Sequence, residues 1–400
     1  MSTMSQSLAW TELPLFSFGF RPFFLAGSAY AALAMAVWVP WYLGVLTLPV
    51  AFDPVTWHIH ELLFGYVLAV VAGFLLTAVP NWTGRLPVVG YPLIGLTVLW
   101  LIGRIAVTVS AWLDPISVAL LSLAFPVTLL GVIAREVIAG NNTKNLVIVA
   151  ALGVLVLAQA LMQFAHANAD DTRIVGRLGI ACVVMLIAII GGRITPSFTR
   201  NWLKKANPGR EPTPIGGFDL VALGVGAVAL TAWVFAEDLT GNFTQPIGIL
   251  LLVAGVLHLL RQARWTPHRT LAEPIVVILH VGYAFVSLGF ILSGLSLTEA
   301  FNVVPLAGIH AWSAGAIGVM TLAVMTRATL GHTGREIRAG PATGLIYACA
   351  VAAALSRIIA TISPEQATTL LALSALMWCV AFFGFALAYG PMLLSTRRSA

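Results

Sequence analysis

The chain has 400 residues, of which 59% are hydrophobic and only 9% are charged. Soluble globular proteins carry charge on about a quarter of their residues, so this composition excludes a water-soluble globule and a disordered chain. The formal net charge is +6. In a membrane protein such an excess of Lys and Arg lies in loops on one face, so it does not indicate nucleic-acid binding. The composition predicts an all-α, polytopic integral membrane protein.

Twelve apolar runs are each long enough to cross a bilayer, which takes about 20 residues of helix. Lipid offers no hydrogen-bond partner to the backbone, so each run is expected to be helical. No internal sequence repeat is strong enough to indicate duplication, and residues 1–400 are expected to form a single transmembrane domain. The expected helices span residues 20–43, 56–79, 90–110, 113–135, 144–165, 173–194, 217–236, 244–262, 273–294, 302–327, 341–361 and 366–392.

The charges of the loops predict the orientation of the chain. Basic residues such as Arg85, Lys205 and Arg261 occupy alternate loops, and acidic residues such as Asp53 and Asp171 occupy the loops between them. Loops rich in Lys and Arg remain in the cytoplasm. Because the number of spans is even, both termini are expected to be cytoplasmic.

Ionisable residues inside the spans are candidates for function, because a charge at the bilayer centre costs about 2.5–3.5 kcal/mol on insertion scales. They fall into two layers. The outer layer consists of His58, His60 and Glu61 in the second span, His310 in the tenth, and Arg104, Arg177 and Arg357. The inner layer consists of His258 and His280, on two spans that run antiparallel.

Imidazole is a common ligand of iron and copper, and a b-type haem in a helix bundle needs histidines at matched depth. The outer histidines are therefore expected to bind a metal, and the inner pair to hold haem b between them. Glu61 is expected to relay protons or to orient a ligating imidazole. The three arginines would bind haem propionates. Alternatively, they pair with Glu61 or with carbonyls at helix ends, and the histidines form hydrogen bonds between helices.

The spacing of His58 and His60 limits what they can do together. Residues two apart point to nearly opposite sides of a regular helix. Both histidines can bind one metal only if the start of this helix is unwound. Otherwise one is a ligand and the other contacts a proton or a propionate.

Several motifs resemble those of the NnrS family, over nearly the whole chain. The motifs are Gly19-Phe20-Arg21-Pro22-Phe23-Phe24, the run Trp57 to Tyr66, Gly191-Gly192-Arg193-Ile194-Thr195-Pro196-Ser197-Phe198, His280, and the run His310 to Arg335. The resemblance implies a bacterial inner (cytoplasmic) membrane protein of the nitric oxide response, containing haem and copper. It also implies an association with denitrification and protection from nitrosative stress. The family's histidines would fall on His58, His60, His258, His280 and His310.

The expected function is detoxification of nitric oxide by reduction to N2O at a histidine-ligated metal site. The expected partners are nitric oxide, membrane lipid and an unknown electron donor. Two alternatives stay open. The chain is an enzyme, an oxidoreductase of the nitric oxide reductase type, or it is a non-catalytic haem protein that binds or senses nitric oxide. A secondary transporter is a further alternative: twelve spans and a basic central loop favour it, but residues 80–87 lack the loop motif of the major facilitator transporters.

Overall fold

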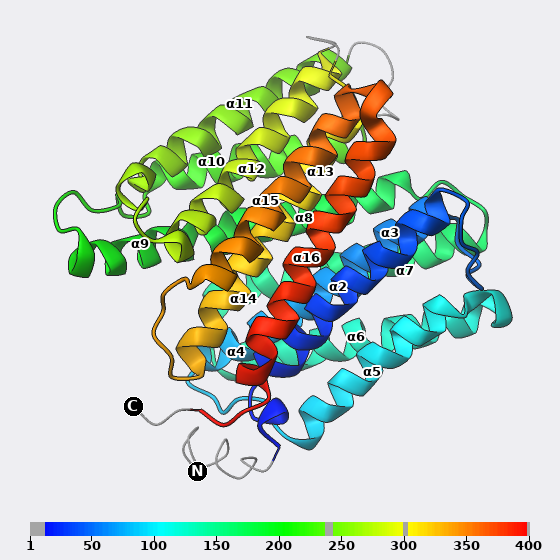
Figure 1. Cartoon of the computed structure of the whole chain (residues 1–400), viewed down its shortest axis with the longest axis horizontal. Helices are drawn as coiled ribbons and strands as arrows, with labels where there is room; N and C mark the ends of the chain where they lie inside the picture. The colour runs from blue at the N-terminus through cyan, green and yellow to red at the C-terminus, as the bar shows by residue number, and fades with distance from the viewer. Residues whose placement is uncertain (1–12, 237–242, 299–302, 398–400) are drawn as a thin grey trace. The chain divides into compact units, whose positions relative to one another are not determined.

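The computed structural model of the chain describes residues 13–236, 243–298 and 303–397 (Figure 1). Within these residues every regular element is helical. Twelve helices in the described part are long and apolar enough to cross a membrane, so the chain is a multi-pass membrane protein. The predicted all-α fold with twelve spans is confirmed. The cytoplasmic location of both termini stays a prediction.

The observed helices agree with most of the expected spans to within a few residues. In chain order they are α2 (Phe20–Tyr42), α3 (Pro54–His60), α4 (Leu68–Thr83), α5 (Tyr91–Thr108), α6 (Pro115–Ala139), α7 (Leu146–Ala167), α8 (Arg173–Leu186), α9 (Gly192–Ala206), α10 (Gly217–Val234), α11 (Thr244–Ala263), α12 (Pro274–Leu297), α13 (Pro305–His310), α14 (Gly318–His332), α15 (Pro341–Ile362) and α16 (Ala367–Leu393). The expected start of the tenth span, residue 302, lies outside the described residues.

Capping residues define where two of these spans begin. Asp53 precedes α3 and accepts hydrogen bonds from the backbone N–H groups of Val55 and Thr56, and Asp114 precedes α6 and accepts one from the N–H of Ser117. Proline follows each cap, at the helical position where a missing N–H costs least. The start of α3 is therefore well defined, and this helix carries His58 and His60.

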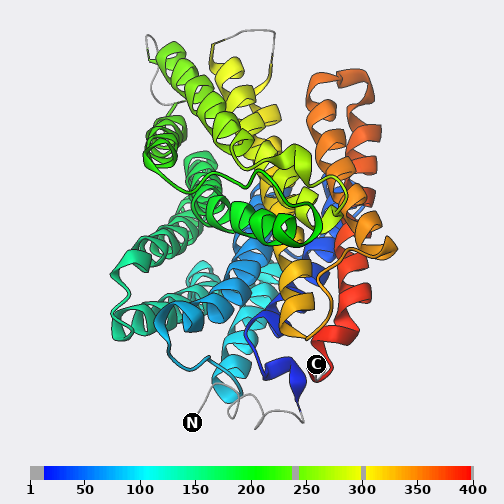
Figure 2. The same ribbon diagram turned by 90° about the vertical axis from the view of Figure 1, so that its left-hand side faces the viewer.

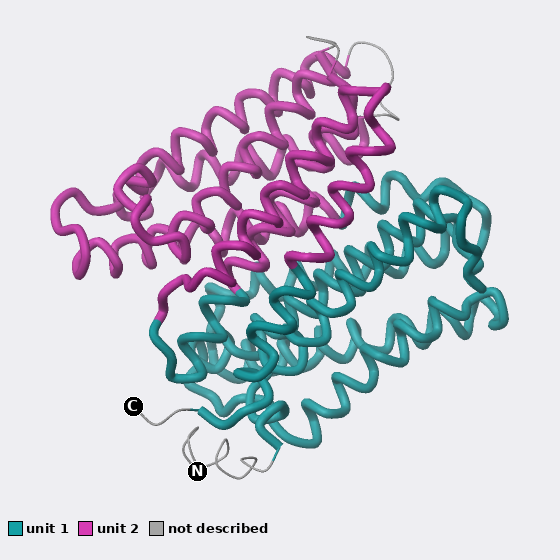
Figure 3. Tube along the Cα trace, in the orientation of Figure 1, with its two compact units in different colours: residues 1–179, 325–336, 382–400 teal, residues 180–324, 337–381 magenta. Residues whose placement is uncertain are grey.

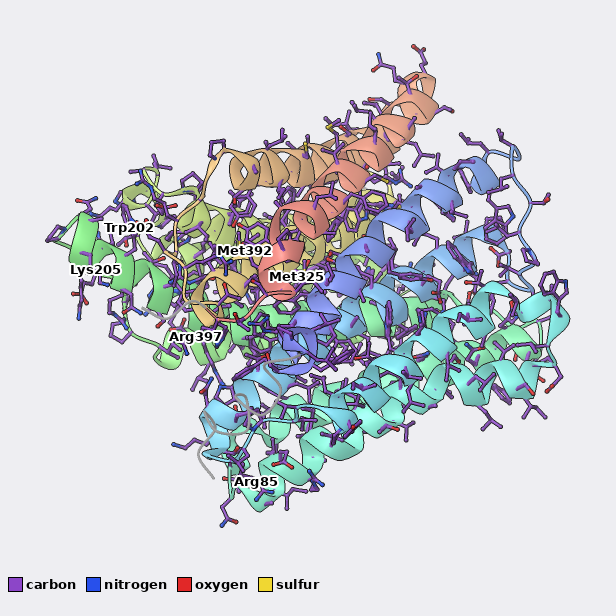
Figure 4. The ribbon with its side chains drawn as sticks, turned by 60° about the horizontal axis from the view of Figure 1, so that its bottom comes forward. Arg85, Trp202, Lys205, Met325, Met392 and Arg397 are labelled. Atoms are coloured by element: carbon purple, nitrogen blue, oxygen red, sulfur yellow. The ribbon has the colours of Figure 1, made fainter. Side chains whose placement is uncertain are left out.

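The sixth span is longer than the sequence indicated. It continues as α9, which is polar and ends near Trp202 and Lys205 (Figure 4). Thr195, Thr199 and Leu203 are buried at a spacing of one helical turn, so one face of α9 packs against the protein. The expected boundary at residue 194 marked the end of the apolar run, whereas the helix continues as an amphipathic one.

Three spans of the described chain contain a π-helical turn. These turns are Glu61–Val67 between α3 and α4, Ile187–Gly191 between α8 and α9, and Ala311–Ile317 between α13 and α14. π-helical turns are rare and occur frequently at functional sites. Each turn changes the direction of the side chains that follow it.

The order of elements repeats along the chain. The spans form three successive sets of four, residues 20–139, 143–263 and 274–393, and the π-helical turn lies in the second span of each set. After that span comes a glycine with positive φ and then an arginine, and these pairs recur at a constant interval: Gly84-Arg85, Gly209-Arg210 and Gly334-Arg335. Apart from these Gly-Arg pairs, the repeat lies in helix lengths and turns rather than in side-chain identity.

The chain divides into two compact units (Figure 3). Unit 1 comprises residues 1–179, 325–336 and 382–400, and unit 2 comprises residues 180–324 and 337–381. This division does not test the expectation of a single transmembrane domain over residues 1–400, which stays a prediction.

Packing within each unit involves helices that follow one another in the chain. In unit 1, α2 packs against α4, and α6 packs against both α5 and α7. In unit 2, α11 packs between α10 and α12. The unit 2 parts of α15 and α16 lie side by side in both views (Figure 1 and Figure 2), where Ser374 donates to the carbonyl of Ala353 at 2.8 Å.

Candidate functional site

A buried polar cluster surrounds Glu61 at the start of a π-helical turn in unit 1. Atom Oε1 of Glu61 lies 2.7 Å from Nδ1 of His60 and 2.5 Å from Nη1 of Arg104 on α5. The other oxygen, Oε2, accepts a hydrogen bond from the hydroxyl of Tyr30 on α2. Glu61 and His60 are fully buried. The cation of Arg104 therefore compensates the carboxylate, which a buried charge requires.

Glu61 determines which nitrogen of His60 carries the proton. An ionised carboxylate only accepts hydrogen bonds, so Nδ1 of His60 is the donor. The neutral imidazole then has its lone pair on Nε2, which lies 3.0 Å from the amide nitrogen of Gln163 on α7. Metal-binding histidines have this arrangement, with an acceptor behind one nitrogen and a lone pair on the other.

Two glutamines on α7 extend the cluster toward α6. The amide of Gln163 also donates to Oγ of Ser122 at 3.1 Å, and Gln159, one turn earlier, donates to the carbonyl of Ser122 at 3.1 Å. Both glutamines are buried. The sequence pattern that indicates these two glutamines is a pair of amide side chains one helical turn apart in an apolar run. Tyr30 offered no comparable signal, because a single tyrosine in a span is ordinary.

His58 lies apart from this cluster. Its ring stacks on that of Trp38, with centroids 4.1 Å apart, whereas His60 faces Glu61 and Gln163. The first turns of this span are regular α-helix up to His60. The structure therefore does not bring the two imidazoles together at one point.

Of the three outer arginines, Arg104 forms an ion pair with Glu61. This pairing was the alternative to binding a haem propionate. Arg177 is buried on α8, near Asp171. Hydrogen bonds from Arg173, together with the charge of Arg177, hold the pKa of Asp171 below its usual value. Arg357 is half-buried on α15, in unit 2.

His310, in unit 2, occupies the position equivalent to His60. Each is the last residue before a seven-residue π-helical turn, and Leu186 has this position in the middle set of spans. Nδ1 of His310 lies 2.8 Å from the carbonyl oxygen of Leu306. A carbonyl only accepts, so Nδ1 donates and the lone pair of the neutral ring is on Nε2. The two histidines thus share one tautomer.

A second buried cluster, in unit 2, surrounds Arg261. Its Nε lies 2.9 Å from Oδ1 of Asp219, and its Nη1 donates to the hydroxyl of Tyr283 at 2.7 Å and to the carbonyl of Ala188 at 2.9 Å. Arg261 was counted from the sequence as a loop cation. It is instead fully buried, and Asp219 compensates its charge.

His258 and His280, the expected haem pair, have different surroundings. Nδ1 of His258 lies 2.8 Å from the hydroxyl of Tyr283, and its Nε2 faces Gly226, where a Cβ would lie 2.8 Å from that nitrogen. The backbone of α10 therefore occupies the space that a porphyrin would need. His280 bonds instead to Thr199 on α9, at 2.9 Å. This arrangement does not fit a haem held between the two rings.

His60 and His258 differ in the group that lies against Nε2 of the ring. Nε2 of His60 meets a side chain, Gln163, which can rotate, rather than a helix backbone. Among the described residues no three His, Cys, Asp or Glu side chains gather so as to hold a metal ion. A single protein histidine is enough to hold a haem, because the porphyrin itself supplies four nitrogen ligands to the iron. The donor chemistry of His60 is therefore that of a haem ligand, and Gln163 would have to move for Nε2 to bind the iron.

Comparison with known proteins assigns the chain to a family. The family model described as NnrS protein matches residues 14–397, nearly the entire length. The comparison with individually curated proteins gives no match. The matched range includes both second-span histidines, the Glu61 cluster and the Arg261 cluster. The chain therefore belongs to the NnrS protein family, and this membership supports a role in the nitric oxide response.

Proposed function

We propose that the protein detoxifies nitric oxide in the bacterial inner membrane, by reducing it to N2O at histidine-ligated metal, with His60 a ligand in unit 1 and His310 a ligand in unit 2. The observation that carries this proposal is the buried pair of Glu61 and His60, which leaves the lone pair of the imidazole on Nε2. His310 supports it, because it has the equivalent position and the same tautomer.

The group that these residues would hold is haem b, with copper as the further candidate. When bound, the metal would supply the site for nitric oxide binding and pass on the electrons for its reduction. We assign no such role to His258 and His280, since the backbone beside Gly226 leaves no room for a porphyrin at His258.

The neighbours of Glu61 hold His60 in its ligating form. Arg104 and Tyr30 both bind the carboxylate, which keeps it ionised, and the ionised carboxylate keeps Nδ1 a donor. An acceptor behind Nδ1 raises the basicity of a ligating imidazole. Because three groups already hydrogen-bond to Glu61, its geometry favours orientation of His60 over the relay of protons.

The surroundings of the site suit a small apolar reactant. Nitric oxide partitions into lipid and reaches a buried centre without a polar channel. The balanced reaction converts two NO, two electrons and two protons into N2O and water. The electrons come from a donor that is still unidentified, and the protons from water at the membrane surface.

Variants at His60 and His58 test this function. The purified full chain is supplied with a chemical reductant and nitric oxide, and nitric oxide loss and N2O formation are measured. We expect repeated turnover in the wild type, loss of turnover in His60→Gln, and retention in His58→Gln, whose ring stacks on Trp38. Consumption that stops at one NO per haem would favour the non-catalytic binding protein. Wild-type protein that consumes none would contradict both.

A further inference from the structure

Unit 2 contains a continuous row of six aromatic rings. In spatial order the row consists of Trp265, Tyr283, His258, Phe290, Trp312 and Trp233. Successive ring centroids lie 4.6, 6.0, 5.3, 5.2 and 4.9 Å apart. Each of these residues is at most 4% exposed. The row is thus an unbroken chain of ring contacts inside the protein.

The row connects opposite ends of α10 and α11, which pack side by side (Figure 1). Trp233 lies in the last turn of α10. Trp265 follows the end of α11, where Arg261 pairs with Asp219 in the first turn of α10. The two tryptophans are therefore separated by most of the length of α10. That is about 20 Å at a rise of 1.5 Å per residue, a large part of the bilayer.

Tyr283 has an acid–base partner within this row. Its hydroxyl oxygen accepts from Nη1 of Arg261 at 2.7 Å, and it lies 2.8 Å from Nδ1 of His258. A guanidinium only donates, so the phenolic hydrogen remains available to the histidine nitrogen, and in the tautomer with its proton on Nε2 this nitrogen accepts it. Loss of an electron makes a phenol strongly acidic, and here a base is already hydrogen-bonded to it. Asp219 compensates the charge of Arg261, which limits repulsion when the imidazole gains a proton.

We propose that the six rings are a path for one-electron oxidation through unit 2, in which Tyr283 is the redox-active residue and His258 takes its proton. The proposal is independent of any metal bound at His60. Its chemical partner is a strong one-electron oxidant soluble in the membrane, such as nitrogen dioxide, which forms where nitric oxide meets oxygen.

The electrons and protons of this path balance. The oxidant takes one electron at Trp233 or Trp312 and, if it is nitrogen dioxide, leaves as nitrite. An electron then moves from Tyr283 to the oxidised tryptophan by tunnelling across the rings of His258 and Phe290, which lie at 9° to each other and are not themselves oxidised. Tyr283 becomes a neutral phenoxyl radical, and its proton moves to Nδ1 of His258. A one-electron reductant at the Trp265 end, such as ascorbate, restores the phenol, and His258 returns the proton.

Photo-oxidation of the full chain tests the path. The purified protein in detergent is oxidised by flash-generated tris(bipyridine)ruthenium(III), and radicals are followed by transient absorption and electron paramagnetic resonance, with and without ring-deuterated tyrosine. We expect a neutral tyrosyl radical in the wild type, loss of most of that signal in Tyr283→Phe, and retention in Tyr389→Phe. Tyr389 is a matched control, since it is a buried tyrosine stacked on Phe385 and lies outside the row.

A second variant covers the case in which Tyr283→Phe fails to fold. His258→Phe keeps a ring against Phe290 but removes the base, so the tyrosyl radical should form at least tenfold more slowly and lose its dependence on solvent deuterium. A wild type without a tyrosyl radical, an equal yield in Tyr283→Phe, or an equal rate in His258→Phe would each overturn the proposal. If Tyr283 and His258 only pack in the core, their variants should change in stability, and the yield and rate of the tyrosyl radical should stay as in the wild type.

Discussion

Oε1 of Glu61 lies 2.7 Å from Nδ1 of His60, the residue before it, and both side chains are fully buried. Adjacent residues in a regular α-helix do not face each other. A π-helical turn begins at Glu61, between the two residues. The change of helix geometry and the contact therefore coincide, and the same change follows His310 in the equivalent span.

The ion pair of Glu61 and Arg104 should be strongly coupled. Removing one partner of a buried pair leaves an uncompensated charge and costs about 3–5 kcal/mol. We expect Glu61→Gln and Arg104→Gln each to destabilise the protein by about this amount, and the double variant to lose much less than the sum. Thermal unfolding in detergent measures this double-mutant cycle.

An ion pair with one exposed partner is the control for that cycle. Arg135 also bonds to a glutamate, Glu136, but its side chain is 69% exposed. Glu136 is buried but keeps Arg85 as a second partner, and a pair formed by an exposed cation is worth about 0–1 kcal/mol, so Arg135→Gln should change stability by no more than this. Strictly additive losses at Glu61 and Arg104 would contradict their coupling.

Gln163 should compete with a metal for Nε2 of His60. Replacing it with leucine removes a hydrogen bond worth about 0.5–1.5 kcal/mol, so the affinity of His60 for haem should rise by up to about tenfold. Titration of haem into haem-free protein, followed by absorption, measures the affinity. Gln159→Leu is the matched control, because Gln159 bonds to the carbonyl of Ser122 and should leave the affinity unchanged. Equal titration curves for both variants would refute the competition.

Two glycines of α10 should respond oppositely to alanine. At Gly226 a Cβ would lie 2.8 Å from Nε2 of His258, whereas at Gly224 it would meet no atom within 4 Å. Gly226→Ala should cost about 1–3 kcal/mol by displacing the imidazole from Tyr283. Gly224→Ala should gain about 0.5–1 kcal/mol from helix propensity. Unfolding midpoints of the two variants check this, and a tolerated Gly226→Ala would mean that His258 is not held against α10.

Acid should weaken the cap of the helix that carries His60. Burial alone would raise the pKa of Asp53, but hydrogen bonds from Thr56 and Val55 outweigh it and hold this pKa below its usual 3.8. A carboxyl whose pKa is lower in the folded than in the unfolded chain stabilises the fold when the pH is above the unfolded pKa. This contribution is lost as the pH falls through the folded pKa. Asparagine caps equally well and does not titrate. The unfolding midpoint of Asp53→Asn should therefore fall less in acid than that of the wild type, and parallel curves would exclude the effect.

The spans were predictable from the sequence because lipid forces every crossing segment to be an apolar helix. The extension of the sixth span was missed because α9 is amphipathic and its buried face, including Thr195 and Thr199, is polar in composition. The π-helical turns and the threefold order of spans depend on backbone geometry and helix length. Beyond the three Gly-Arg pairs at a constant interval, neither leaves an evident pattern of side chains.

The cost of burying charge identified His60 and Glu61 as candidates, and the pairing of Arg104 with Glu61 was one of the alternatives it left open. That reasoning predicted only how deep each residue lies in the membrane. It placed His258 and His280 at matched levels, but could not show that they face α10 and α9. Rotation about the helix axis, which decides what a ring contacts, became known only from the structure.

The absorption spectrum of the purified full chain, with iron and copper analysis, tests most directly whether His60 and His310 each ligate a metal that reacts with nitric oxide. The reduced wild type should contain metal and show a haem band that shifts when nitric oxide is added. His60→Gln and His310→Gln should lose metal, and His58→Gln should keep it. A colourless wild type without iron or copper would contradict the proposal, as would full metal content in His60→Gln and His310→Gln.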